Sequence, residues 1–355
     1  MSTQSAPAAS GIPSTSATPR PPSRRETLLL AGAIVFTVLA WASAFLVIRG
    51  VAPHLAPGGL AFGRLVVGAL ALVVLFAISR RWVTPTAREW MLLLGYGVLW
   101  FGLYNVALNT AETTLDAGTT AMIVNVGPIL IALGGGLIFH EGISRWLAIG
   151  FVVSFAGIVL IGVASGAHFG DLGGMLWCLV AAVTYAAGVL TQKPTLRRLP
   201  GIQVTLLGAL IGAVVTSPFA PQLVGDLGRV AHDTPQSLSP VVLGIVYLGV
   251  VPTALAFTTW AYALGRVPAS RLGISTYVVP PIAVLLGWAV FGEVPAPLAL
   301  VGGVICLAGV ALSRRRGRPR GAAAPAPSAV VAGERAPVSE AADAPVGAER
   351  RDLSE

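Results

Sequence analysis

Long runs of apolar residues, separated by short polar connections, extend through most of the chain. Each run has about 18–23 residues, and an α-helix of that length, rising about 1.5 Å per residue, crosses a hydrocarbon core of about 30 Å. The pattern therefore predicts an all-α, polytopic membrane protein with ten transmembrane helices. We place these helices at residues 27–48, 57–78, 90–110, 117–139, 145–163, 172–192, 202–220, 241–263, 269–291 and 296–313, and we expect the longest connection, residues 221–240, to be a loop.

The composition agrees with a chain that lies mostly in lipid. Hydrophobic residues make up 55% of the 355 positions and charged residues 11%, less than half of the roughly 25% that is typical of soluble domains. The mean hydropathy is +0.80. These values argue against a soluble enzyme, a nucleic-acid-binding protein and a disordered regulator. Residues 1–25 are rich in Ser, Thr, Pro and Ala and residues 317–355 in Ala and Pro, and we expect both to be disordered cytoplasmic tails.

Basic residues are distributed unevenly between the connections, and this distribution predicts the orientation in the membrane. With the N-terminus inside, the external face holds little beyond Arg49 and Arg229. Both termini are then cytoplasmic, and we expect a multi-pass protein of the inner (plasma) membrane. The basic residues on the cytoplasmic side are Arg20, Arg24, Arg25, Arg80, Arg81, Arg88, Arg145, Lys193, Arg197, Arg198, Arg266, Arg314, Arg315 and Arg316.

The second half of the chain repeats the first. Over residues 111–160, thirteen of fifty positions are identical to the residue 152 places later, Pro128, Glu141 and Gly157 among them. An offset of 144 aligns the first apolar run with the sixth. Each half contains five spans, an odd number, so the second half crosses the membrane in the opposite sense, as in many transporters. The predicted inverted five-helix repeats are residues 26–163 and 170–316.

Several motifs occur in both halves. The first run reads AWASAFLVIRG from Ala40, the second contains Pro57 and GRLVVGALAL, the fourth reads VNVGPILIALGGGLIFHE and the ninth reads TYVVPPIAVLLGWAVFGE. Together these motifs resemble the EamA-type family of the drug/metabolite transporter superfamily, over about residues 25–315. In the first motif Ala42 stands where the family more often has glycine. The resemblance implies ten helices, inverted repeats and export or uptake of small metabolites such as amino acids and nucleobases.

Arg64 lies about two turns inside the second run, seven residues after Pro57. A charge at the middle of the bilayer costs at least about 2.5 kcal/mol unless its side chain reaches the interface or lines a water-filled cavity. Two interpretations are therefore open. In one, the side chain extends to the external interface. In the other, it faces a cavity and binds a carboxylate or a neighbouring helix.

Other polar and aromatic residues inside the runs are candidates for the substrate path. Such residues commonly form hydrogen bonds between helices, worth about 0.6–2 kcal/mol each, and a minority line a path. Asn125 and Tyr277 correspond under the 152-residue offset, and each precedes a proline by three residues. Trp41 and Tyr185 correspond under the 144-residue offset; they either stack on an apolar substrate or pack in the core. The candidate cavity residues are Trp41, Ser43, Arg64, Asn105, Asn125, Tyr185 and Tyr277.

Two further repeated pairs have alternative interpretations. Pro128 and Pro280 interrupt the hydrogen bonding of their helices, and they form either a hinge or cavity wall or a simple packing kink. Glu141 and Glu293 end the fourth and ninth runs on opposite faces. They either take part in proton coupling or bond to the first-turn amides of the next helix, where the helix dipole favours a negative charge. No other carboxylate is predicted to lie deep in a span.

The sequence predicts a secondary transporter that moves a small amino-acid-like, nucleobase-like or drug-like solute by alternating access, with export favoured. The alternatives are a channel or scaffold without coupled transport and, less favoured, a membrane-embedded enzyme, for which no cluster of catalytic groups is visible. The chain lacks a GxxxxGK[ST] motif, a CxxC motif and an HExxH motif, so no catalytic residue, metal or cofactor is expected. The expected partners are a small-molecule substrate and the lipid bilayer, with no nucleic acid, in a monomer or homodimer.

Overall fold

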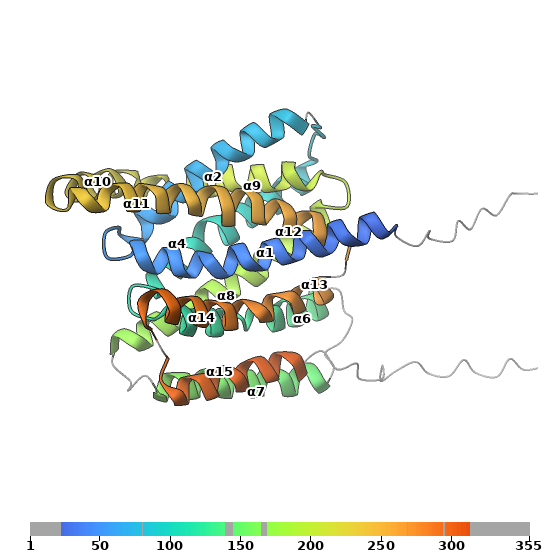
Figure 1. The fold of residues 1–355 in the computed structure, drawn as a ribbon. Coiled ribbons are helices and arrows are strands. Elements are labelled where there is room, and N and C mark those ends of the chain that lie inside the picture. Colours follow the sequence, from blue (N-terminus) through green and yellow to red (C-terminus); the bar gives the residue numbers. More distant parts are fainter. Residues whose placement is uncertain are drawn as a thin grey trace, which may run out of the picture. The chain divides into compact units, whose positions relative to one another are not determined.

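A computed structural model describes residues 23–79, 81–138, 145–164, 169–267, 269–293 and 295–312. Every regular element among these residues is a helix, and none of them forms a β-strand. The helices stack in layers (Figure 1). In chain order they are α1 Arg24–Val51, α2 Pro57–Ser79, α3 Ala87–Tyr96, η1 Gly97–Leu103, α4 Tyr104–Ala111, α5 Ala117–Val124, α6 Gly127–Ile138, α7 Arg145–Ala164, α8 Phe169–Thr195, α9 Gly201–Thr216, η2 Ser217–Phe219, α10 Ala220–Asp233, α11 Pro235–Leu248, η3 Gly249–Leu255, α12 Ala256–Leu264, α13 Ala269–Ser275, η4 Thr276–Val278, α14 Val279–Phe291 and α15 Pro297–Leu312.

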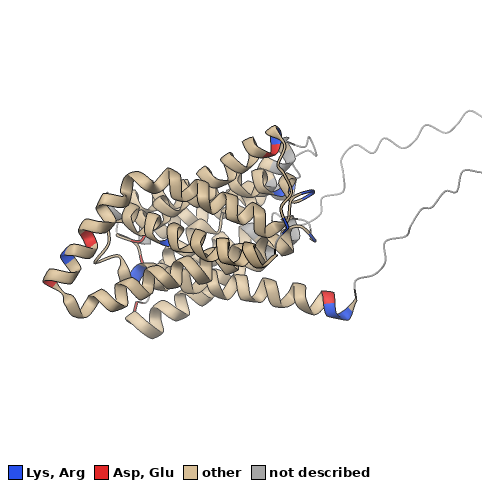
Figure 2. Ribbon diagram, turned by 90° about the horizontal axis from the view of Figure 1, so that it is seen from above, with Lys and Arg blue, Asp and Glu red and all other residues tan. Residues whose placement is uncertain are grey.

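The outer surface of the bundle is apolar and its charges lie at the helix ends. On α2, the side chains of Leu70, Val74 and Ile78 are 62%, 62% and 75% exposed. Figure 2 shows that the charged residues gather near the two ends of the bundle, while the middle of the helices is largely uncharged. A helical bundle with such a surface is suited to lipid, because its backbone hydrogen bonds are satisfied internally. The segments long and apolar enough to cross a membrane are Arg24–Val51, Pro57–Ser79, Ala87–Ala111, Leu172–Thr195, Gly201–Asp233 and Pro235–Leu264.

Within the described part of the chain, these six segments indicate a multi-pass membrane protein. Further apolar helical stretches lie at Ala117–Ile131, Ala148–Ile161, Thr276–Phe291 and Pro297–Gly309.

Polar residues at the edges of the apolar runs determine where helices begin. The Ser23 hydroxyl accepts a hydrogen bond from the Glu26 N–H, and the Glu26 carboxylate accepts one from the Ser23 N–H. Thr86 and Glu89 make the same reciprocal pair at the start of α3. Such capping boxes satisfy amide groups that the first turn of a helix leaves free.

The polar segment between the seventh and eighth runs is helical, contrary to the loop expected over residues 221–240. Helix α10 extends from Ala220 to Asp233, and α11 begins at Pro235. Asp226 is buried in this segment, accepts a 2.8 Å hydrogen bond from the Ala56 N–H and pairs with Arg229. Asp226 therefore faces a neighbouring part of the chain from one side of an amphipathic helix, while Arg229, His232 and Asp233 are exposed.

Helical geometry changes at related positions in the two halves. The π-helical segments η1 and η3 are offset by 152 residues, the same offset as the sequence repeat. A second interruption separates α5 from α6, and the short 3-10 turn η4 separates α13 from α14. Pro128 and Pro280 are the second residues of α6 and α14. A proline there lacks an N–H that the first turn does not use, so each proline begins a new helical segment.

Helices α7 and α15 pack against each other as the lowest layer of Figure 1. Their contact is reciprocal. A Cβ atom placed on Gly157 would lie 2.5 Å from the Gly302 carbonyl oxygen, and one placed on Gly309 would lie 2.7 Å from the Gly150 carbonyl oxygen. These two pairs exchange under the 152-residue offset. Glycine at these points allows the two backbones to approach closely.

One hydrogen bond crosses the centre of this contact. The Ser154 hydroxyl donates to the Cys306 carbonyl oxygen at 2.8 Å, and the two residues are themselves separated by 152 positions. Residues later in α7 contact residues earlier in α15. The two helices are therefore antiparallel.

Candidate functional site

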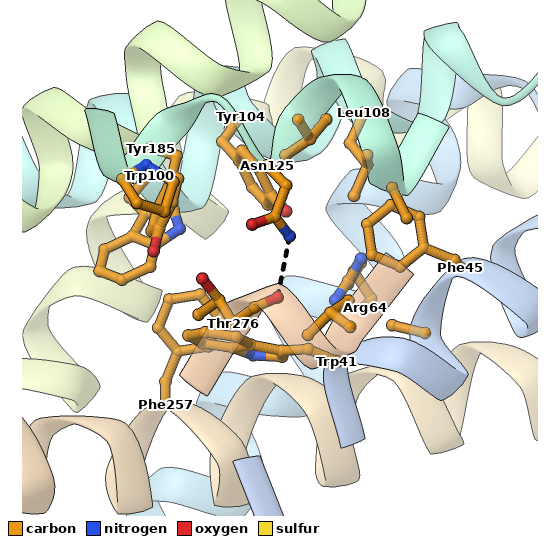
Figure 3. A pocket seen from close by; sticks show the side chains of 15 residues that line it. Trp41, Phe45, Arg64, Trp100, Tyr104, Leu108, Asn125, Tyr185, Phe257 and Thr276 are labelled. Carbon is orange, nitrogen blue, oxygen red and sulfur yellow. Dashed lines mark hydrogen bonds between the residues drawn. The ribbon is translucent and has the colours of Figure 1, made fainter. Parts of the chain in front are cut away.

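A cavity lies in the interior of the bundle (Figure 3). Residues from both halves of the chain line it, and most of them are apolar or aromatic. Among the residues that the structure places on its wall, Arg64 is the charged one. The wall consists of Trp41, Ala44, Phe45, Arg64, Trp100, Tyr104, Leu108, Ala121, Val124, Asn125, Pro128, Tyr185, Phe257, Thr276 and Val279.

Arg64 is buried and faces this cavity rather than the outer surface. Its side chain is part of the wall, and the residue is 4% exposed. One terminal nitrogen, Nη2, donates a 3.3 Å hydrogen bond to the Thr253 hydroxyl. Nε and Nη1 have no hydrogen-bond partner among the described residues. A guanidinium with unused donors in a cavity is suited to bind a carboxylate through charge-assisted hydrogen bonds.

Aromatic rings form the opposite side of the cavity. The centroid of Trp100 lies 5.0 Å from that of Tyr185 and 4.9 Å from that of Phe257. Trp41 lies 5.5 Å from Phe257 and donates a 3.3 Å hydrogen bond from Nε1 to the Pro252 carbonyl oxygen. In Figure 3 Trp100 and Tyr185 lie at the left and Arg64 at the right, with Trp41 drawn between them. Rings held by packing offer a stiff apolar surface to a bound side chain.

Asn125 connects the two helix interruptions at the cavity. It is the C-terminal cap of α5, and its Nδ2 donates a 2.9 Å hydrogen bond to the Thr276 carbonyl oxygen at the start of η4. The dashed line in Figure 3 marks this bond. Breaks in membrane helices leave backbone groups that must be satisfied by neighbours or by water. Here a side chain from one half of the chain satisfies a carbonyl from the other.

The structure brings together four of the seven residues that the sequence suggested for the cavity, namely Trp41, Arg64, Asn125 and Tyr185. Pro128 lines the cavity as well, whereas Pro280 is buried beside it in the first turn of α14.

The other three suggested residues lie elsewhere than on the described wall. The Ser43 hydroxyl pairs with the Tyr247 hydroxyl at 2.7 Å, which joins α1 to α11. Asn105 donates a 2.7 Å hydrogen bond to the Phe101 carbonyl, at the end of the π-helical segment. Tyr277 is partly buried in η4, where its neighbour Thr276 faces the cavity.

Sequence reasoning missed Phe45, Tyr104 and Phe257, which line the cavity. Phe45 lies one helical turn after Trp41 and therefore on the same face of the helix, so the helical spacing from Trp41 could have predicted it. Tyr104 follows a π-helical segment whose altered pitch changes which residues face inward.

One end of the bundle carries a small group of charged residues. Arg49 donates a 2.8 Å hydrogen bond from Nε to the Glu293 carboxylate and one of 3.1 Å from Nη1 to the Glu112 carbonyl oxygen. This links the ends of α1, α4 and α14, and we call this end of the bundle the Arg49 end. Glu293 therefore takes part in an interhelical ion pair. Its counterpart Glu141 lies outside the described residues.

Comparison with known proteins identifies the family. A family model described as "EamA-like transporter family" matches residues 28–163 and again residues 172–315. A protein of Streptantibioticus cattleyicolor named "Probable terminal-alkyne amino-acid exporter" is 33% identical over 298 residues, which cover 82% of this chain and 96% of the relative. The transporter YdfC of Bacillus subtilis, named as uncharacterized, is 31% identical over 292 residues, which cover 81% and 91%.

A solved crystal structure shares the fold. It has a TM-score of 0.54 and 19% sequence identity, and it covers 81% of this chain and 96% of its own. The repeated family match and the relatives together show that the chain is a membrane transporter of small organic solutes and belongs to the EamA-like transporter family.

Proposed function

We propose that this protein is a secondary transporter that exports an amino acid with an apolar or aromatic side chain. The arrangement of Arg64 opposite the rings of Trp100 and Tyr185 carries this proposal. Arg64 binds the carboxylate, and the rings hold the side chain. The named amino-acid exporter among the relatives supports both the solute class and the direction of transport.

The proposed architecture is ten transmembrane helices in two inverted five-helix repeats, over residues 26–163 and 170–316. Three observations support it: the two family matches, the common offset of η1 and η3, and the reciprocal, antiparallel contact of α7 with α15. In this architecture the two halves exchange conformations around the shared cavity, which gives alternating access. Helices α7 and α15 hold the halves together, while the remaining helices build the cavity.

The proposed orientation places both termini and the tails 1–25 and 317–355 in the cytoplasm, in the plasma (inner) membrane. The excess of arginine in the connections at that face supports this orientation. The Arg49 end is then external. Opening of that end, with loss of the Arg49–Glu293 ion pair, would release the solute outside the cell.

Counterflow in proteoliposomes tests the function. Liposomes containing the purified full chain are loaded with unlabelled L-phenylalanine and diluted into labelled L-phenylalanine. We expect transient accumulation of label, because a carrier exchanges solute across the membrane. Two competitors separate the parts of the solute: L-alanine lacks the large side chain and phenethylamine lacks the carboxylate. We expect both to compete weakly, whereas L-leucine and the terminal-alkyne amino acid L-propargylglycine compete well.

A flux that never saturates and shows no counterflow would contradict a carrier and indicate a channel. Strong competition by phenethylamine would contradict the role of Arg64, because that amine presents no group for a guanidinium to bind.

A further inference from the structure

Glu112 is a buried acid one helical turn beyond the cavity. It follows the last residue of the span Ala87–Ala111, and its side chain is inaccessible to solvent. The Glu112 N–H donates a 3.1 Å hydrogen bond to the carbonyl of Leu108, and Leu108 lines the cavity. One turn of helix is about 5.4 Å. On α1, Arg49 has the same relation to Phe45, which also lines the cavity.

The Glu112 carboxylate is unlike the other buried acid of this end. Neither of its oxygens has a hydrogen-bond partner among the described residues. Asp226, by contrast, accepts a hydrogen bond from the Ala56 N–H and pairs with Arg229, and it thereby fixes a connection. An ionised carboxylate without partners is costly to bury. Glu112 is thus not used by the fold and is available for a cation.

The charged groups around Glu112 allow a cation bound to its carboxylate to be exchanged for another. Burial raises the pKa of the Glu112 carboxyl well above its ordinary value, while Arg49 and Arg64 act in the opposite direction. Arg49 donates from Nη1 to the Glu112 backbone carbonyl and from Nε to Glu293. It does not bond the Glu112 carboxylate. The groups whose charges act on Glu112 are Arg49 of α1, Arg64 of α2, Tyr104 of α4, Cys178 of α8, Asp116 before α5 and Glu293 after α14.

An amino acid carries its ammonium and its carboxylate on the same carbon. In the proposed pose Arg64 binds the carboxylate, and the ammonium on the adjacent carbon points to the side of the cavity formed by Phe45 and Leu108, which lie next to Arg64 in Figure 3. Glu112 lies one turn beyond that side. The cavity thus has a buried cation with unused donors and, adjacent to it, a buried acid with unused acceptors.

We propose that Glu112 is the second charged residue of the solute site, binding a proton when the site is empty and the ammonium group of the amino acid when it is occupied. This proposal rests on the transport of amino acids proposed above. When the solute binds, the Glu112 O–H bond breaks, its proton passes to water, and the carboxylate pairs with the ammonium. Proton and solute therefore compete, and export of one amino acid brings one proton into the cell.

Proton release on ligand binding tests this assignment without any flux. The detergent-solubilised full chain is mixed with L-phenylalanine in weakly buffered solution near neutral pH, and released protons are counted with a pH indicator while binding is followed by calorimetry. We expect one proton per bound molecule. The ligand 3-phenylpropanoate keeps the carboxylate and ring but lacks the ammonium, and we expect it to bind without releasing a proton.

Variants assign the proton to its residue. The variant Glu112→Gln is expected to bind L-phenylalanine at least tenfold more weakly and to release no proton. It is expected to bind 3-phenylpropanoate with the same affinity as the unmodified protein. Glu293→Gln removes the neighbouring acid and is expected to keep the release. Glu112→Asp, which retains the carboxyl group, is expected to keep it as well and serves if the glutamine variant does not fold.

Release that persists in Glu112→Gln, or that disappears in Glu293→Gln instead, overturns the assignment. Binding of L-phenylalanine to the unmodified protein without release overturns it too. If neither ligand binds, the proposed amino-acid substrate is wrong, and the role of Glu112 is rejected with it. These outcomes separate the failure of this proposal from the failure of the proposed function.

Discussion

The side chain of Asn125 donates a hydrogen bond of 2.9 Å to the Thr276 carbonyl, and this bond joins the interruption of one helix to the interruption of its counterpart in the other half. Both residues lie on the wall of the cavity. Any change in the width of the cavity between these two segments must stretch or break this bond. Asn125 is thus placed to connect solute binding with movement of the halves.

We expect Asn125→Ala to reduce counterflow strongly. Its buried carbonyl partner is left unsatisfied, which costs about 1–3 kcal/mol in the unfolding free energy. Asn105→Ala is a matched control, because Asn105 is equally buried but bonds a carbonyl of its own helical region. Both variants should lose stability to a similar extent in thermal unfolding, and Asn105→Ala should retain transport. Equal losses of transport would contradict a special role for Asn125.

Arg64→Lys tests the shape of the cation. Lysine keeps the charge but lacks the planar fork that binds a carboxylate through two hydrogen bonds. Loss of one charged hydrogen bond costs about 1.5–3 kcal/mol, so the Kd for 3-phenylpropanoate should rise roughly tenfold or more. Calorimetry measures this change directly. An unchanged Kd would show that the carboxylate binds elsewhere.

Gly157→Ala should destabilise the contact between α7 and α15. The added methyl group would lie 2.5 Å from the backbone of both Gly302 and Cys306, and backbone atoms cannot move aside as side chains do. Overpacking of this kind typically costs about 1–3 kcal/mol. Gly32→Ala is the control, because nothing lies within 4 Å of a Cβ atom at Gly32. The Tm of Gly157→Ala should lie well below that of Gly32→Ala, and the reverse order would contradict the packing argument.

Cysteine labelling tests the orientation. Asp233 is the last residue of α10 at the Arg49 end and Arg197 lies after α8, and both are exposed. In intact cells, a membrane-impermeant maleimide should label Asp233→Cys and leave Arg197→Cys unlabelled until the membrane is broken. The native thiols, Cys178 and Cys306, are buried and should give little background. The opposite labelling pattern would place the termini outside.

Patterns repeated along the chain predicted the helices and part of the cavity. The lengths of the apolar runs located the helices, and the offsets of 144 and 152 selected Trp41 with Tyr185 and also Asn125. The 3-10 turn at η4 was not visible in the sequence, and it places Thr276 rather than Tyr277 on the cavity wall. A regular helical register cannot anticipate such a local change in rotation.

Burial of charged groups was harder to predict. Glu112 follows an apolar run and reads as an ordinary residue of a connection, so its burial was not expected. Its burial depends on how α1, α4 and α14 converge around Arg49. Likewise, Asp226 lies in a segment expected to be a loop, and its burial depends on the distant amide of Ala56. Contacts distant in sequence decide the burial of both acids, and local patterns do not contain them.

The reciprocal glycine contact of α7 and α15 also bears on how this protein is assembled in the cell. Each half presents to the other a surface like its own, with Gly150 and Gly157 on one side and Gly302 and Gly309 on the other. Surfaces that match in this way associate without a covalent link between them. Two genes, each encoding one half and divided between α7 and α8, should therefore restore a working protein when expressed together, provided that the two products insert in opposite directions.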